Sequence, residues 1–210
     1  MTDQAAIVMV HGLWMKRWTW SAYRWFFNSQ GFRVYLFGYK TTKQPFERSA
    51  MKLAAFVNSR PESTVHLLVH SMGGLLAMQA MPNIIKTGKL LMLGSPVRGS
   101  QVARKLHRLG WHRRLLKHAT SPLTTGVSQS QFKRPSLMIA GTSPVGLGRV
   151  IERQLGHGDG TVSVEETRAE WIDEHREVHT SHFGLLMNRQ AMQLALDFLS
   201  PVMDSDESAL

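Results

Sequence analysis

The chain has 210 residues, of which 43% are hydrophobic and none is cysteine. The length suits one globular core, and the lack of cysteine excludes disulfides, thiolate metal sites and a cysteine nucleophile. The formal net charge of +10 points to an acidic partner or substrate carrier. The first residues carry neither the basic start of a signal peptide nor a long apolar run, so we expect a cytoplasmic protein without a membrane span.

The chain alternates between short apolar runs, typical of buried strands, and stretches with helical spacing. In chain order we expect a strand at 6–10, a helix at 18–30, a strand at 33–39, a helix at 45–58, a strand at 65–70, a helix at 72–81, strands at 90–93 and 136–140, a short helix at 165–171, a strand at 176–180 and a helix at 188–199. This alternation predicts an α/β domain over residues 1–210, with a mostly parallel sheet flanked by helices.

A basic segment, 98–133, interrupts this alternation. It lies within the stretch between Glu62 and Glu152, which holds twelve Lys and Arg but no acid, while the rest of the chain has 13 basic and 15 acidic residues. Ligands of parallel sheets bind at the carboxyl ends of the strands, so we predict that 98–133 is a lid insertion over that edge. Its core, 102–120, is a basic amphipathic stretch. It could be a solvated face over a core stripe, a site for anionic lipid headgroups, or a docking site for an acidic protein that carries an acyl chain.

A serine stands where the 65–70 strand meets the 72–81 helix, in His70-Ser71-Met72-Gly73-Gly74. Serine is a favoured helix cap, so a simple turn is one interpretation. The other is a nucleophile elbow, in which a serine on a strained strand-to-helix turn is displayed above the sheet. The elbow pattern is Gly-x-Ser-x-Gly, and Val69 occupies the first glycine position.

A nucleophilic serine needs an acid and a histidine, which follow it in that order in such folds. The first aspartate after Ser71 is Asp159, within Gly-His-Gly-Asp-Gly after the predicted 136–140 strand. An Asp-Gly pair alone indicates an ordinary turn, but the position after a strand favours catalysis. Three histidines follow it: His175, His179 and His182. Because His182 lies in the loop between the last strand and the last helix, we predict a triad of Ser71, Asp159 and His182.

Ester hydrolysis also needs N–H donors for the oxyanion. One candidate is Met72, directly after the serine, and the other is Leu13 in His11-Gly12-Leu13-Trp14, after the first strand. Trp14 is a candidate to cover the acyl pocket. The alternative for this second segment is an ordinary turn beside a buried tryptophan.

Four segments resemble the marker motifs of the α/β-hydrolase superfamily: His11-Gly12-Leu13-Trp14, His70-Ser71-Met72-Gly73-Gly74, Asp159-Gly160-Thr161-Val162 and Ser181-His182-Phe183-Gly184-Leu185. The resemblance spans roughly residues 6–200, apart from the insertion. It implies an ester, thioester, lipid or amide hydrolase that needs no cofactor or metal. The short chain also implies that the first antiparallel strands of the superfamily are missing or abbreviated.

Within that superfamily, the layout and charge are similar to enzymes that cleave the methyl ester of pimeloyl-acyl carrier protein in biotin synthesis, where basic lid residues steer the carrier. By this likeness the docking candidates are Arg98, Arg104, Lys105, Arg108, Arg113 and Arg114. We therefore expect a serine esterase for a carrier-linked ester, with a lipase-like or small carboxyl ester hydrolase as the alternative. A non-catalytic basic binding module is the alternative of another class. Nucleic-acid binding is not supported by any recognised motif.

Overall fold

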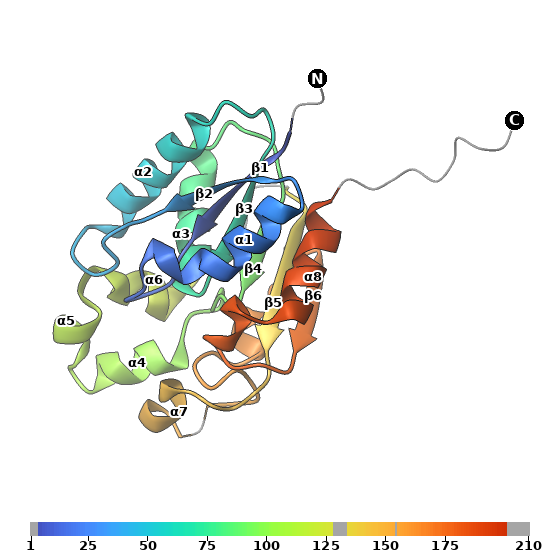
Figure 1. The fold of residues 1–210 in the computed structure, drawn as a ribbon. Helices are drawn as coiled ribbons and strands as arrows, with labels where there is room; N and C mark the ends of the chain where they lie inside the picture. The colour runs from blue at the N-terminus through green and yellow to red at the C-terminus, as the bar shows by residue number, and fades with distance from the viewer. Residues whose placement is uncertain (1–3, 128–133, 154, 201–210) are drawn as a thin grey trace, which may run out of the picture.

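The computed structural model of the chain describes residues 4–127, 134–153 and 155–200. Its centre is a six-stranded sheet in the order β2-β1-β3-β4-β5-β6, in which all neighbouring strands are parallel (Figure 1). The strands are β1 (Ala6–Val10), β2 (Arg33–Phe37), β3 (Val65–His70), β4 (Leu90–Leu93), β5 (Ser136–Gly141) and β6 (Glu174–Val178). The sheet class expected from the sequence is therefore confirmed.

The four central strands are buried along their whole length, whereas β2 and β6 lie at the edges and are partly exposed. A parallel strand covered on both faces needs apolar residues at every position, which is why β1, β3, β4 and β5 read as continuous apolar runs. The register pairs Val10 with Val69, and Val69 with Met92. The carboxyl ends of β1, β3 and β4 therefore lie side by side and place their following loops at one edge.

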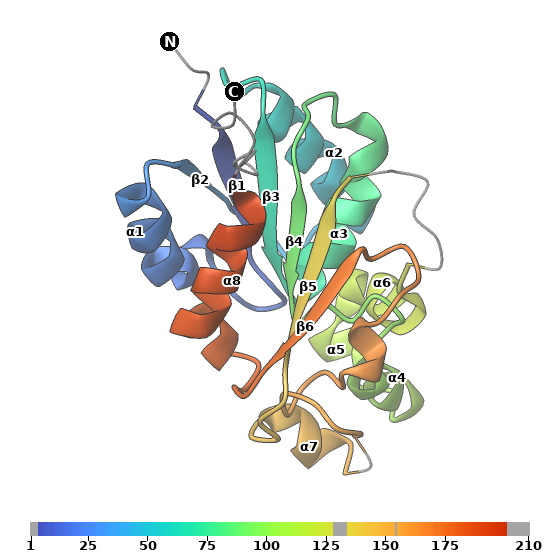
Figure 2. The same ribbon diagram turned by 90° about the vertical axis from the view of Figure 1, so that its right-hand side faces the viewer.

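Helices cover both faces of the sheet. Helices α1 (Ser21–Ser29) and α8 (Arg189–Leu199) lie on one face, and α2 (Phe46–Asn58) and α3 (Met72–Ala80) lie on the other (Figure 2). Each face has its own apolar core. Ile7 and Met9 pack with Phe27 of α1, whereas Val8 and Val10 pack toward the α2 and α3 side. Short 3-10 helices complete the fold: η1 (Arg17–Trp20), η2 (Met81–Asn83), η3 (Lys117–Ala119), η4 (Glu165–Thr167) and η5 (Gly184–Leu186).

The basic insertion lies beyond the carboxyl ends of the strands, as α4 (Gln101–Arg108), α5 (His112–Leu115), η3 and α6 (Thr120–Thr125). The expected amphipathic stretch 102–120 is thus several short helices. Gly110, with φ of 73°, follows α4 and ends it in the left-handed conformation that glycine adopts readily. The short helix α7 (Leu147–Ile151) lies nearby. Positions 128–133, the end of the predicted insertion, lie outside the described residues.

Three expected elements differ from the structure. The predicted helix at 18–30 is split into η1 and α1, and only Glu165–Thr167 of 165–171 is helical. The last strand covers Glu174–Val178 and not 176–180, because its pairing with β5 begins with Leu137 opposite Glu174. A polar edge strand carries too weak an apolar pattern for its start to be read from sequence. In the described part of the chain, every helix is too short or too polar to cross a bilayer.

Candidate active site

Ser71 occupies a strained turn between β3 and α3. Its φ of 54° and ψ of −126° lie in a region that residues with a side chain rarely adopt. Hydrogen bonds from its N–H to the Leu93 carbonyl (2.9 Å) and from Gly74 N–H to its own carbonyl (3.0 Å) hold this backbone. The Ser71 side chain makes no capping hydrogen bond to α3, so the helix-cap interpretation is wrong. Backbone strain of this kind persists where the surroundings enforce it, and it is concentrated at functional sites.

The valine at the first glycine position of the elbow is compatible with this turn. A Cβ atom on Gly74 would lie 2.3 Å from the Ser95 hydroxyl oxygen and 3.6 Å from a methyl carbon of Val69. A Cβ atom on Gly73 would lie 2.6 Å from the Val10 carbonyl oxygen. The close approach of helix and sheet is therefore provided by the two glycines after the serine, and the Val69 side chain fits beside Gly74.

His182 and Asp159 form a buried pair. The Nδ1 atom of His182 lies 2.6 Å from Oδ2 of Asp159, and both side chains are almost fully buried. Oδ1 of Asp159 accepts hydrogen bonds from the N–H groups of Thr161 (2.9 Å) and Val162 (2.8 Å), and the His182 N–H donates to the Asp159 carbonyl (3.0 Å). The carboxylate thus fixes the imidazole through Nδ1. The other ring nitrogen, Nε2, is not bound to Asp159. His182 and Ser71 line the same cavity.

A second histidine packs directly against His182. The ring centroids of His70 and His182 are 4.6 Å apart, and Nε2–H of His70 donates to the His182 carbonyl (3.0 Å). Complete burial, with the neighbouring His182 as a further cause, holds the pKa of His70 well below its usual value. His70 therefore presents a neutral ring that fixes the backbone of the His182 loop. Its position directly before Ser71 was the only sequence signal for this contact.

His11 orients the peptide that precedes Leu13. Its Nδ1–H donates to the Gly12 carbonyl (3.0 Å) while its Nε2 accepts from the Tyr39 N–H (3.4 Å), an arrangement that defines the tautomer. The Met15 N–H also donates to the Gly12 carbonyl (3.3 Å). In a trans peptide the C=O and the following N–H point in opposite directions, so the Leu13 N–H points away from these partners. Burial lowers the pKa of His11 and favours its neutral form.

Both predicted oxyanion donors lie next to Ser71. A Cβ atom on Gly12 would be 2.9 Å from the Ser71 Cβ, so the Gly12–Leu13 peptide lies against the serine. Met72 begins α3, where the N–H groups of the first turn have no partner within the helix. The Leu13 amide, in the peptide after Gly12, and the Met72 amide, directly after the serine, are thus both neighbours of Ser71.

A cavity of about 130 Å³ adjoins Ser71 and His182. Its walls are mostly apolar and come from the loop after β1, the lid and the loops after β5 and β6: Leu13, Trp14, Val102, Ala103, Leu106, Leu116, Leu123, Ile151, Val162 and Phe183. Trp14 borders the cavity at its exposed end, with 58% of its surface exposed, and its indole N–H donates to the Leu115 carbonyl of the lid (3.2 Å). The expected Trp14 cover is therefore at the rim of the cavity and not buried.

Glu166, which the sequence did not single out, joins the lid to the Asp159 loop. Its buried carboxylate accepts hydrogen bonds from the N–H of Gln101, the first residue of α4, and from the N–H (2.6 Å) and hydroxyl (2.9 Å) of Ser163. Arg104 lies 4.0 Å away. Burial raises the pKa of Glu166, against the opposing effect of these hydrogen bonds and the Arg104 charge. The carboxylate anchors the start of α4 to the loop that carries Asp159.

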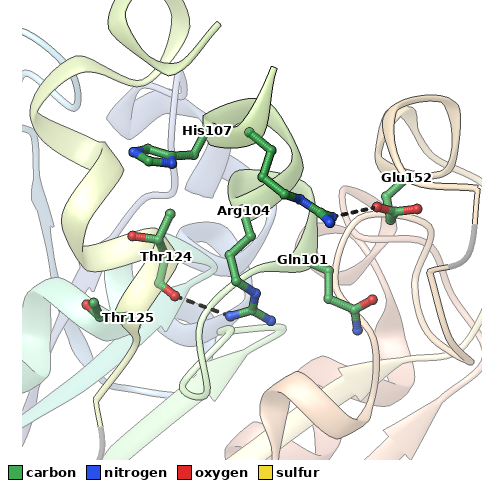
Figure 3. A pocket seen from close by; sticks show the side chains of 7 residues that line it. Gln101, Arg104, His107, Thr124, Thr125 and Glu152 are labelled. Atoms are coloured by element: carbon green, nitrogen blue, oxygen red, sulfur yellow. Dashed lines mark hydrogen bonds and ion pairs between the residues drawn. The ribbon is translucent and has the colours of Figure 1, made fainter. Parts of the chain in front are cut away.

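Four of the six predicted docking residues bind acids of the same chain. The pairs are Arg98 with Glu165, Arg104 with Glu166, and Lys105 (4.0 Å) and Arg108 (3.7 Å) with Glu152. Figure 3 shows Arg104 reaching the Thr124 carbonyl, at 3.2 Å, in the open cavity between α4 and α6. Arg113 and Arg114 are exposed and form no ion pair within the described residues. These four basic residues therefore help to hold the lid in place.

Comparisons with solved structures give the fold. The mature form of Bacillus licheniformis lipase BlEst2 superposes with a TM-score of 0.78 at 20% identity, over 96% of this chain and 94% of that one. For a mutant of polyneuridine aldehyde esterase the TM-score is 0.64 at 14% identity, over 94% and 100%. For tomato methylketone synthase I complexed with 2-tridecanone it is 0.59 at 15% identity, over 94% and 98%. No curated protein matched in the sequence comparison.

The sequence comparison with family models identifies the family directly. A model described as the alpha/beta hydrolase family matches residues 7–201, a range that runs from the second residue of β1 to beyond the end of α8. The parallel sheet, the strained serine after β3 and the histidine–aspartate pair beyond β5 and β6 lie within this range. The chain belongs to the alpha/beta hydrolase family.

Proposed function

We propose that the protein hydrolyses carboxylic esters through a serine nucleophile. The observation that carries this proposal is the strained Ser71, which shares one apolar cavity with a histidine fixed by a buried aspartate. A merely structural serine gains nothing from a disfavoured backbone conformation, and Ser71 does not cap its helix. Ester hydrolysis also agrees with the names of two fold neighbours, a lipase and an esterase.

The proposed reaction is acyl transfer. Ser71 Oγ attacks the ester carbonyl carbon while Nε2 of His182 accepts the hydroxyl proton. Asp159 stabilises the resulting imidazolium through its 2.6 Å hydrogen bond to Nδ1. The Leu13 and Met72 N–H groups bind the oxyanion. His182 then gives the proton to the leaving alcohol oxygen, and a water molecule, activated by the same histidine, releases the acid from Ser71.

The cavity favours a short, apolar acyl group. Its volume of about 130 Å³ is below the roughly 300–1,000 Å³ of typical ligand pockets. Leu106 and Leu123 of the lid form part of its wall. An acyl chain longer than a few carbons would need these lid helices to move. We therefore propose short-chain esters as the substrates that this lid position accepts.

The methyl ester of pimeloyl-acyl carrier protein stays a narrower prediction. Its support was the basic insertion, and ion pairs to Glu152, Glu165 and Glu166 occupy four of the six docking candidates. Arg113 and Arg114 remain as candidates for contact with a carrier. Restoration of biotin prototrophy in a strain that lacks its own esterase of this kind would support the prediction, and failure by an expressed, active protein would remove it.

Hydrolysis of p-nitrophenyl butyrate tests the general proposal. Ser71→Ala and His182→Ala should each lower kcat by at least about 10³-fold, because these residues act as one unit. The matched control is His179→Ala, which removes a nearby histidine whose ring lies outside the cavity and should keep most of the activity.

Covalent labelling gives an independent readout. An organophosphonate probe should label wild type and His179→Ala at Ser71, as located by peptide mass spectrometry, and should not label Ser71→Ala. Hydrolysis by Ser71→Ala at the wild-type rate, or labelling at another serine, would overturn the proposal. Far-ultraviolet circular dichroism of each variant would establish that it is folded.

A further inference from the structure

The segment from η1 to α1 presents apolar residues on two opposite sides. Trp20, Tyr23 and Phe27 are buried in the core. On the outside, Trp18 and Trp25 are 67% and 76% exposed, although they are among the largest apolar side chains in the protein. A surface segment needs only one apolar stripe to pack on its domain, so a second stripe of tryptophan facing water is unexplained by folding.

The two exposed tryptophans share one groove with two arginines. A groove of about 520 Å³ is lined by Arg17, Trp18, Arg24 and Trp25, together with Ser21, Asn28 and Leu36. We call the four large residues, Arg17, Trp18, Arg24 and Trp25, the Trp–Arg surface. Trp18 and Trp25 are seven positions apart, about two helical turns, as are Arg17 and Arg24. The spacing thus repeats an arginine–tryptophan pair along one side of the segment.

The stretch of chain that carries this surface contains bases and no acids. No acid occurs between Asp3 and Glu47, while this stretch holds six bases: Lys16, Arg17, Arg24, Arg33, Lys40 and Lys43. Arg17 and Arg24 take no part in an ion pair anywhere in the described part of the chain. The charge count over the whole sequence assigned the entire positive excess to the middle of the chain. It did not reveal this second basic region, because acids elsewhere in the chain balance its charge. The Trp–Arg surface therefore has no internal partner for its charge.

The surface begins at the mouth of the candidate active site. Trp14, which borders the acyl cavity, precedes Trp18 by four residues, and its N–H joins it to the lid. Helix α1 and the lid helices α4, α5 and α6 lie on opposite sides of the sheet (Figure 2). A planar partner that rested on the Trp–Arg surface would thus lie close to the entrance of the cavity.

We propose that the Trp–Arg surface binds the surface of a membrane that contains anionic phospholipids. Tryptophan is favoured at the level of lipid headgroups, where its ring is in contact with acyl chains and its N–H with polar groups. Arginines beside it attract anionic headgroups. A lipid surface also has the uniform negative charge that a stretch with bases and no acids complements. Membrane binding would bring the cavity close to amphipathic esters, and this consequence rests on the proposed hydrolase activity. The binding itself does not depend on that activity.

Co-sedimentation of the full chain with vesicles tests the proposal. The protein should bind vesicles of phosphatidylcholine with phosphatidylserine, and bind much less to phosphatidylcholine alone or at high salt. Arg17→Gln with Arg24→Gln should weaken binding about 25-fold, since each base near such a surface contributes about fivefold. Trp18→Ala with Trp25→Ala should weaken it by at least roughly tenfold.

The matched control is Met51→Ala with Ile85→Ala, which removes two equally exposed apolar side chains elsewhere and should bind like wild type. Ser71→Ala should also bind normally, so failure of the hydrolase proposal and of this one are distinguishable. All surface variants should keep the far-ultraviolet circular dichroism spectrum of wild type, which shows that they are folded. Undiminished vesicle binding by the tryptophan double variant would overturn the proposal. Binding to an acidic acyl carrier protein with none to vesicles would overturn it in favour of carrier docking.

Discussion

Replacing Ser71 by glycine removes the proposed nucleophile and the strain of its turn together. A residue with a side chain in such a conformation costs about 1–3 kcal/mol, whereas glycine adopts it freely. Glycine loses more backbone entropy on folding, which costs about 0.5–1 kcal/mol. The midpoints of these ranges leave a net stabilisation of about 1 kcal/mol. For a chain of this size that raises the unfolding temperature by roughly 2–4 °C.

Ser71→Ala is the matched comparison, because it removes the hydroxyl and keeps the Cβ atom that makes the backbone strained. Calorimetry of both variants should give the higher midpoint for Ser71→Gly, and neither should hydrolyse p-nitrophenyl butyrate. The hydrogen bond from the Ser71 N–H to Leu93 and the one from Gly74 hold the turn in both variants. An unfolding midpoint of Ser71→Gly at or below that of Ser71→Ala would refute the strain argument.

Three further predictions concern residues around the site and the sheet. Burial, with Lys89 as a further cause, lowers the pKa of His66 from 6.5 in the unfolded chain to about 4, so the unfolded state binds the proton first as the pH falls. The contribution of neutral His66 to the free energy of unfolding is therefore complete above about pH 6.5 and declines by about 3 kcal/mol toward pH 4. The Oδ1 atom of His66→Asn can still accept a hydrogen bond from the Lys89 N–H, so urea unfolding of this variant should show a shallower decline with falling pH. His11→Ala should lower kcat by up to about 10²-fold with little change in KM, because the Leu13 amide loses its orientation, and His11→Asn should recover part of it; equal rates for wild type and His11→Ala would contradict this role. Glu166→Gln should leave the sheet folded but raise amide hydrogen exchange in α4 and lower activity, and unchanged exchange there would show that the carboxylate does not anchor the lid.

The central part of the fold was readable from the sequence, because β1, β3, β4 and β5 are covered on both faces and so read as apolar runs. The proximity of His182, Asp159 and Ser71 was readable for a related reason: in a parallel sheet, loops that follow neighbouring strands meet at one edge. The alternation of strands and helices was thus enough to predict which loops come together.

The contacts that complete the site were not readable. His70 touches His182 across 112 positions, and Glu166 binds Gln101 across 65. No local pattern encodes such pairs, since each depends on where two loops come to rest in three dimensions. The division of the lid into short helices was not readable either. Its apolar residues have helical spacing, but Gly110 in the left-handed conformation ends α4.

Helix α4 separates two different surroundings. Ala103 and Leu106 border the apolar cavity at Ser71, whereas Arg104 and Arg108 border the open cavity on its other side. Residues on one side of a helix recur every three or four positions, so the two sets never overlap. Substitutions that enlarge or narrow the acyl cavity can therefore accumulate without altering the charge outside, and the reverse holds too. The lining of the apolar cavity and the ion pairs that hold the lid are thus free to evolve along separate lines within eight residues of one helix.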